Sequence, residues 1–334
     1  MKKLLLAAVI LFIAGSSSAA QTVLQFALPT LEIHPRNQAL LRWADDLKAR
    51  SKDQLTIAFQ HGVTNYPGTR IPAAVAEGVY DLGAPGWWHL SLFVPSFSIS
   101  SLPMFYGQDI QDLRRVLDGG LSEALHERLE QALQLRVLGS SLDLGFGHIF
   151  TTVKPVKAHA DLQGLNIRVP GGTADLARYL VFEATPRRIA ARHLASALRR
   201  KLVGGLLATH NFVVDAALWE VGVQHGFLDN QIFYYYTPVI NRARWEALLD
   251  EERVWLAESW AAALNQMRQL MANRQDRSRA VAARSGMQFV EVPRGQRQRM
   301  RKALMEEQGT VAKALEIDTK LIELARSLLS SKPH

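Results

Sequence analysis

The stretch that decides the fold is Asp161-Leu162-Gln163-Gly164-Leu165-Asn166-Ile167-Arg168-Val169-Pro170, which runs on into Gly171-Gly172-Thr173. Residues 166–170 have the composition of a strand, and the glycines lead into a helix that we expect from Ala174 to Phe182. A strand that turns through glycines into a helix is the unit from which α/β domains are built. The turn also presents backbone N–H groups that suit an anion.

Arg168 lies inside this strand. A guanidinium holds a carboxylate through two parallel charge-assisted hydrogen bonds, so one fixed arginine can orient an organic acid. From the local pattern alone, a surface ion pair is the commoner role for an arginine on a strand. Both interpretations stay open at this point.

The same alternation of strand and helix occurs upstream, which favours a largely parallel sheet. We expect strands at 23–28, 55–59 and 79–83, and helices at 37–51 and 69–76. Downstream we expect a buried extended segment at 102–105 and strands at 136–139 and 150–153, of which the last leads into a second lobe. A long strand at 233–240 should cross back to the first lobe, which the elements between residues 23 and 139 form. Asp250 can cap a long helix that runs to about Ser285 and is ended by Gly286.

Length and composition bound the answer further. The chain has 334 residues, of which 48% are hydrophobic and 21% charged, so two globular domains are expected and a wholly disordered chain is excluded. The absence of cysteine excludes disulfide scaffolds, thiolate metal sites, iron–sulfur clusters and cysteine nucleophiles.

The first twenty residues have the layout of a secretory signal peptide. Lys2 and Lys3 form a basic start, residues 4–15 carry no charge, and Ser18-Ala19-Ala20 supplies small residues for cleavage. The apolar run is too short to span a bilayer, and a lipoprotein anchor would need a cysteine. We therefore expect an exported, periplasmic protein.

The formal net charge of +8 comes from two local patches. Residues 265–302 hold ten Arg or Lys against two acids, and residues 187–201 hold a second basic cluster. A solvated helix face is the expected explanation, with docking to a membrane partner as the alternative. Nucleic-acid binding is not expected, because no recognition motif or interleaved aromatic residue accompanies the charge.

Several other side chains are candidates for a binding site. Trp87 and Trp88 follow the strand at 79–83, where ligand sites of open α/β sheets lie, although both could belong to the core. Tyr235 lies on the returning strand, and His34, His148 and His210 could meet in a cleft. The histidines lack acidic neighbours in sequence, so no metal or cofactor is expected. No nucleophile elbow, zinc-binding or phosphate-binding motif is present, which argues against an enzyme.

The order of these landmarks resembles the solute-binding proteins of tripartite ATP-independent periplasmic (TRAP) transporters, the DctP-type family. The segment 161–170 is close to the family's Asp-Leu-Lys-Gly-Leu-Lys-Ile-Arg motif. The resemblance also includes His34-Pro35 with Asn37, Glu77-Gly78-Val79-Tyr80-Asp81, Val94-Pro95, Leu102-Pro103-Met104-Phe105, Ala184-Thr185-Pro186, Ala197-Leu198, Glu220-Val221, and Asn241 with Trp245. It covers residues 23–325.

The resemblance implies an α/β, two-lobed periplasmic-binding-protein fold with hinge-crossing strands and a long C-terminal helix. Lobe 1 would comprise 21–146, with 237–255 returning to it, and lobe 2 would comprise 147–236. The long helix and the C-terminal helical region, 250–331, would pack across both lobes. Such a protein performs no reaction. It would act as a monomer that captures an organic acid and delivers it to small and large permease subunits.

The family's carboxylate-clamping arginine falls on Arg168. Its second pocket arginine is replaced by His148, or by Gly147 if the alignment slips by one residue, and its usual Asn by Ala208. Leu207 replaces an acid, and Ala191 stands where a larger residue is usual. We therefore expect a monocarboxylate with a hydrophobic or aromatic body. The alternatives are a binding protein for another transporter or a sensor, an exported hydrolase-like enzyme, and a protein whose pocket has degenerated.

Overall fold

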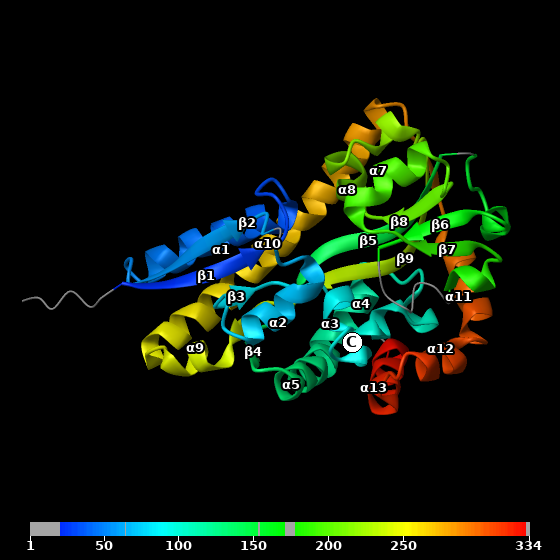
Figure 1. Cartoon of the computed structure of the whole chain (residues 1–334). Coiled ribbons are helices and arrows are strands. Elements are labelled where there is room, and N and C mark those ends of the chain that lie inside the picture. The colour runs from blue at the N-terminus through cyan, green and yellow to red at the C-terminus, as the bar shows by residue number, and fades with distance from the viewer. Residues whose placement is uncertain (1–20, 64, 153, 171–177, 332–334) are drawn as a thin grey trace, which may run out of the picture.

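The computed structural model describes residues 21–63, 65–152, 154–170 and 178–331. Figure 1 shows two lobes, each built around one sheet, with β5 and β9 running between them. The strands are β1 (Thr22–Leu28), β2 (Leu55–His61), β3 (Leu82–Gly83), β4 (Leu135–Val137), β5 (Leu142–Thr151), β6 (Asn166–Val169), β7 (Thr185–Arg188), β8 (Gly205–Ala208), β9 (His225–Tyr236), β10 (Val239–Asn241) and β11 (Gln288–Glu291).

Helices cover the faces of both sheets. Their bounds are α1 (Pro35–Arg50), α2 (Ile71–Ala76), α3 (Trp87–Leu90), α4 (Ile110–Val116), α5 (Ser122–Ala132), α7 (Ala191–Arg199), α8 (His210–Asp215), α9 (Arg242–Ala247), α10 (Asp250–Arg284), α11 (Arg294–Met305), α12 (Gln308–Ala314) and α13 (Thr319–Ser330). Residues 178–181 are also helical, while the start of that expected helix and its glycine turn lie outside the described residues. None of the described helices has the length and apolar character needed to cross a membrane.

The sheet of lobe 1 has the strand order β2-β1-β3-β10-β4, and the sheet of lobe 2 has the order β11-β9-β5-β8-β6-β7. The pairs β1–β2, β1–β3, β6–β7 and β6–β8 are parallel, as the alternation of strand and helix predicts. The paired β5 and β9 are antiparallel along their whole length, from Leu142 opposite Tyr236 to Thr151 opposite His225. The expected lobe boundary after residue 146 falls inside β5.

The long helix α10 holds the two lobes together. Its first turn is acidic, and Glu252 accepts a hydrogen bond at 2.8 Å from the backbone N–H of Leu249, so Leu249 and not Asp250 takes the cap position. In lobe 1, Trp43 of α1 meets Trp260 of α10 edge to face at 5.2 Å between ring centroids. In lobe 2, the helix packs against α8.

Several predicted elements are wrong in detail. The strand expected at 79–83 comprises only Leu82–Gly83, and the strand expected at 150–153 overlaps the end of β5. Residues 102–105 are buried but not extended: Pro103–Phe105 forms a 3-10 turn, closed by a 2.9 Å hydrogen bond from Phe105 N to Leu102 O. The predicted strand at 233–240 is divided, because Pro238 cannot donate to a ladder. β9 ends at Tyr236, and β10 begins at Val239.

A buried polar network joins the lobes near these turns. The Tyr106 hydroxyl donates to Asp229 of β9 at 2.7 Å and also contacts His159 of lobe 2. Gln231 donates to the same Asp229 oxygen at 2.9 Å and accepts from the Tyr179 hydroxyl at 2.8 Å. Asp229 and Gln231 are fully buried, so every bond of this network is shielded from water.

The basic segment 265–302 is not simply a solvated helix face. Half of its cations pair with acids on other elements: Arg268 with Asp118 and Asp143, Arg274 with Asp215, Arg279 with Glu291, Arg294 with Asp109 and Asp112, and Arg297 with Asp109. Half of the basic side chains of this segment therefore link secondary-structure elements through ion pairs and do not simply face water.

Candidate functional site

Arg168 lies at the carboxyl edge of the lobe 2 sheet, on β6 between β7 and β8. Its Nε donates to Ile189 O at 2.9 Å and its Nη1 to Leu207 O at 3.4 Å. The guanidinium also lies 5.5 Å from the Phe212 ring centroid. The side chain is 4% exposed. Backbone acceptors on two neighbouring segments therefore fix the orientation of this cation, as a pre-organised anion contact requires.

A cavity of about 290 Å³ lies where β5 and β9 join the lobes, and we call it the hinge cavity. Its walls come from β5, β9, the start of α8, one face of α10, the start of α4 and the end of β11. The lining residues are Ile110, Asp143, Leu144, Gly145, Phe146, His148, His210, Leu228, Asn230, Phe233, Arg268, Ala272, Gln275, Asp276, Arg279 and Glu291.

Two of the predicted site residues, His148 and His210, meet at the hinge cavity. Their ring centroids are 5.1 Å apart, and the side chains are 5% and 7% exposed. His148 Nδ1 accepts a hydrogen bond from the Asn230 N–H at 3.3 Å. Among the described residues, His210 Nδ1 is buried without a hydrogen-bond partner.

Both imidazoles are held in the neutral form. Burial lowers the pKa of His148 well below its usual value, and electrostatic interactions with His210, Arg279 and Arg297 lower it further. Burial, followed by the charge of Arg279, lowers the pKa of His210 to about 4. At neutral pH this pair therefore offers dipoles and flat ring faces and adds no positive charge.

The charged groups around the hinge cavity are largely paired. Arg279 binds Glu291, and Asp143 contacts Arg114 and lies 4.0 Å from Arg268. The amide of Gln275 is fixed by three hydrogen bonds of 2.7 to 3.1 Å to Leu144 O and the Asn211 backbone and side chain. Phe146 and Phe233 add an edge-to-face aromatic pair at 4.7 Å. The cavity is thus partly apolar and close to charge balance.

The remaining aromatic candidates lie elsewhere. Trp87 and Tyr235 are in contact at 4.7 Å between ring centroids, but both are only 2% exposed and belong to the core of lobe 1. The Trp87 Nε1–H donates to Thr237 at 3.0 Å. Trp88 is half-buried against Tyr234 and Tyr236, at 5.2 and 5.3 Å. The structure therefore does not bring the tryptophans or Tyr235 to the histidine pair.

Strand pairing places the altered positions close together. His148 of β5 lies directly opposite Ala208 of β8, and Leu207 supplies the carbonyl that accepts from Arg168. Gly147 faces the other side of the sheet, since a Cβ there would lie 2.8 Å from the ring of Tyr234 and 2.9 Å from Ile232. His148, and not Gly147, therefore shares a sheet face with Ala208.

Two groups of buried or cavity-lining polar residues were not predicted from the sequence. Arg36 is 2% exposed, donates to Thr30 Oγ1 at 2.8 Å and to Ala84 O at 3.2 Å, and lies 4.6 Å over the Tyr236 ring. No local signal identifies it. By contrast, Gln275 and Arg279 of α10 follow Arg268 by seven and eleven residues. This is a helical spacing that could have indicated one shared face.

The described residues contain no group of three or more His, Asp or Glu that could hold a metal ion. The arrangement can fix an anion at the carboxyl edge of lobe 2 and enclose a small molecule at the hinge. Both are binding tasks, and neither places a nucleophile beside a general base.

Comparisons with known proteins agree with this geometry. The family model DctP, bacterial extracellular solute-binding protein family 7, matches residues 27–313. The 2,3-diketo-L-gulonate-binding periplasmic protein YiaO of Escherichia coli is 27% identical over 275 residues, covering 80% of this chain and 82% of the relative.

Two solved TRAP periplasmic solute-binding proteins share the fold. The one from Ochrobactrum anthropi, whose C-terminus is bound in its ligand-binding pocket, has a TM-score of 0.85 at 20% identity, covering 93% of this chain and 95% of that one. The one from Ralstonia eutropha, with bound (S)-2-acetolactate, has a TM-score of 0.82 at 20% identity, covering 93% and 99%.

Proposed function

Because this chain belongs to the DctP family, family 7 of the bacterial extracellular solute-binding proteins, we propose that it captures an organic acid in the periplasm and delivers it to the membrane subunits of a TRAP transporter. The family binds solutes and does not transform them, so the chain is a binding protein and not an enzyme. The observation that carries the proposal is the family match over residues 27–313, which includes the lobe 2 sheet, the lobe 1 sheet except the start of β1, and the strands that join them.

The architecture supports capture by closure of two lobes. Among the described residues, β5, β9 and the long helix α10 run between the two sheets, and a connection of this kind permits hinge motion around a bound ligand. The division into lobes at residues 21–146 with 237–255, and 147–236, is our proposal for the units that move. The hinge cavity lies at their junction, so a molecule enclosed near it would contact elements of both lobes.

We propose that the ligand is a monocarboxylate with a hydrophobic or aromatic body, and that Arg168 binds its carboxylate. Two carbonyls hold the guanidinium at the sheet edge, while the neighbouring His148 is neutral and Ala208 offers no side-chain polar group. A ligand with a second charge would lose water there without gaining a partner, which costs several kcal/mol. The compounds named for the Escherichia coli and Ralstonia relatives, 2,3-diketo-L-gulonate and acetolactate, each carry one carboxylate.

A binding panel tests the ligand class. Purified protein is titrated by calorimetry with aliphatic and aromatic 2-oxo and 2-hydroxy acids, C4-dicarboxylates and hexuronates. We expect the aromatic monocarboxylates to bind with the highest affinity. Tight binding of dicarboxylates together with no binding of aromatic acids would exclude the proposed class.

Arg168 is tested by substitution. Loss of a two-pronged contact with a carboxylate should weaken binding about 100-fold in Arg168→Ala, and Arg168→Lys should recover part of that loss. Arg187→Ala is the matched control, since Arg187 lies opposite Arg168 on β7, is exposed, and among the described residues donates only to Asn166, at 3.1 Å. Wild-type affinity in a folded Arg168→Ala protein would refute the proposal that Arg168 binds the carboxylate.

Export and delivery are tested separately. We propose that residues 1–20, which lie outside the described residues, are removed during secretion, and that the protein acts as a monomer. Intact mass of the secreted protein and light scattering check these two points. Uptake of the labelled ligand into vesicles that contain the small and large permease subunits should require this protein.

A further inference from the structure

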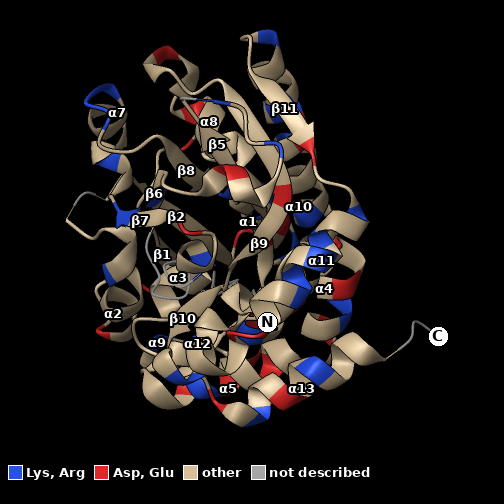
Figure 2. Cartoon of the chain, turned by 90° about the vertical axis from the view of Figure 1, so that its right-hand side faces the viewer, with Lys and Arg blue, Asp and Glu red and all other residues tan. Residues whose placement is uncertain are grey.

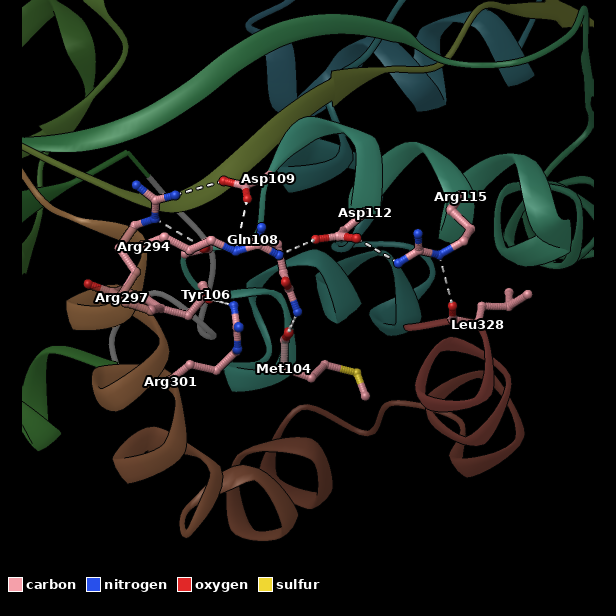
Figure 3. A network of polar contacts seen from close by, with 11 residues as sticks. Met104, Tyr106, Gln108, Asp109, Asp112, Arg115, Arg294, Arg297, Arg301 and Leu328 are labelled. Carbon is pink, nitrogen blue, oxygen red and sulfur yellow. Dashed lines mark hydrogen bonds and ion pairs between the residues drawn. The ribbon is translucent and has the colours of Figure 1, made fainter. Parts of the chain in front are cut away.

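Four of the five cations of α11 fall into two sets with different surroundings. Arg294 and Arg297 face the segment before α4, where Arg297 binds Asp109 at 2.7 Å and Arg294 approaches Asp109 and Asp112 at 3.3 and 3.7 Å (Figure 3). Arg297 also donates to Gly107 O at 3.2 Å. This inner set is paired with carboxylates and fastens α11 to lobe 1.

The outer set is not neutralised. Arg301 donates to the Tyr106 carbonyl at 2.8 Å and forms no ion pair with a described carboxylate, while Asp112 and Asp109 lie near enough to favour its charged form. Lys302 of α11 and Arg326 of α13 are exposed, and neither forms an ion pair with any residue that the structure describes. Figure 2 shows the run of basic residues along α11 on the surface of the molecule.

These three cations line one groove of about 320 Å³ between α11 and α13, which we call the α11–α13 groove. Its lining residues are Met104, Gln108, Gln298, Arg301, Lys302, Met305, Arg326, Leu329 and Ser330. No acidic residue is among the described residues that line it. It shares no residue with the hinge cavity.

The groove has an apolar floor beneath its cationic rim. Met104 is 4% exposed and its side chain reaches into the space between the two helices, as Figure 3 shows. Met305 is 36% exposed, and Leu329 is half-buried. Methionine side chains are flexible and polarizable, so they adapt to the apolar side chains of a partner.

We propose that the α11–α13 groove docks an acidic amphipathic segment of a protein partner. Apolar side chains of that segment would cover Met104, Met305 and Leu329, and its carboxylates would meet the cationic rim. A concave apolar floor favours inserted side chains over a flat membrane surface. The unpaired charge of the rim favours an acidic partner over a second copy of this basic chain.

A designed peptide provides the test. A fluorescein-labelled helical peptide carries Leu on one face and Glu on the other, and its counterpart carries Lys in place of Glu. Fluorescence anisotropy at low salt should show binding of the Glu peptide alone, and salt should weaken it because the rim charges are exposed. Equal binding of both peptides, or no binding of the Glu peptide, would overturn the proposal.

The charge-reversal variant Lys302→Glu/Arg326→Glu should weaken binding of the Glu peptide at least about tenfold. The control Arg277→Glu/Arg284→Glu makes the same charge change at two exposed positions of α10, away from the groove, and should leave affinity within about twofold. An equal loss in both variants would show only general electrostatic attraction and overturn the assignment.

Two further measurements exclude other occupants. Phosphatidylglycerol vesicles that bind the wild type but not the groove variant, in the absence of peptide binding, would assign the surface to lipid. Concentration-dependent dimerisation lost in the groove variant would assign it to a second copy. Calorimetry with the organic acid should be unchanged in the groove variant, so failure of this proposal is distinguishable from failure of the proposed function.

Discussion

Removal of one hydroxyl from the network between the lobes should destabilise the protein measurably. Tyr106→Phe keeps the ring against His159 and Phe182 but removes the donor that binds Asp229 at 2.7 Å. The Asp229 side chain is fully buried, and among the described residues only Gln231 also donates to that oxygen, at 2.9 Å. The substitution therefore takes away one of two direct donors where water cannot replace it.

The magnitude follows from this environment. A hydrogen bond to a charged acceptor contributes roughly 1.5–3 kcal/mol, and an under-satisfied buried acceptor costs toward the upper end of that range. We expect the free energy of unfolding to fall by about 2–3 kcal/mol. In an Asp229→Asn background the acceptor is neutral, so the same substitution should cost only about 1 kcal/mol.

Urea unfolding followed by circular dichroism measures both quantities. The control is Tyr80→Phe, because Tyr80 is half-buried and its hydroxyl has no hydrogen bond to a described residue. The midpoint should decrease for Tyr106→Phe without a change in the slope. A loss no greater than that of Tyr80→Phe, or full additivity with Asp229→Asn, would refute the assigned role of the network.

Two further predictions concern the hinge. Gly145→Ala should destabilise the protein by about 2 kcal/mol in thermal unfolding, because Gly145 has φ of 133° and a Cβ there would lie 2.8 Å from Gln275 Cγ. The control Gly309→Ala, where a Cβ meets nothing within 4 Å, should not destabilise the protein. The folded-state pKa of His210, about 4, lies below the unfolded value of 6.5, so the unfolded state binds the proton first. The free energy of unfolding should therefore fall as pH drops from about 6.5 to 4. In urea titrations, His210→Gln should reduce that pH slope by up to about 1.4 kcal/mol per pH unit. An unchanged slope in His210→Gln would show that the imidazole is already charged in the folded protein.

The sequence predicts the α/β class, the long helix and the family, because helical spacing, glycine turns and the 161–170 motif are local signals. It predicts the pairing of His148 with His210 only as one option among scattered histidines. The burial of Trp87 depends on contacts with Thr237 and Tyr235, which lie far along the chain and which no local pattern records. The same limit applies to Arg36, whose partners Ala84 and Tyr236 are distant in sequence.

The division of the basic segment into paired and unpaired cations also depends on tertiary structure. Composition gives the net charge of residues 265–302 but not the position of Asp109 or Asp112 beside Arg294 and Arg297. Once those pairs are known, two of the cations that remain, Arg301 and Lys302, lie together at the α11–α13 groove.

The place of β10 in lobe 1 determines when that lobe can form during synthesis. β10, at Val239–Asn241, lies between β3 and β4, so the sheet stays in two pieces until more than two-thirds of the chain exists. The core of the lobe waits longer, because Trp43 donates to Ser259 across 216 residues. A nascent chain that ends before Ser259 therefore exposes apolar strand edges of lobe 1. Because lobe 1 has not yet formed in such a chain, the chain can pass through a channel unfolded without any native structure being lost.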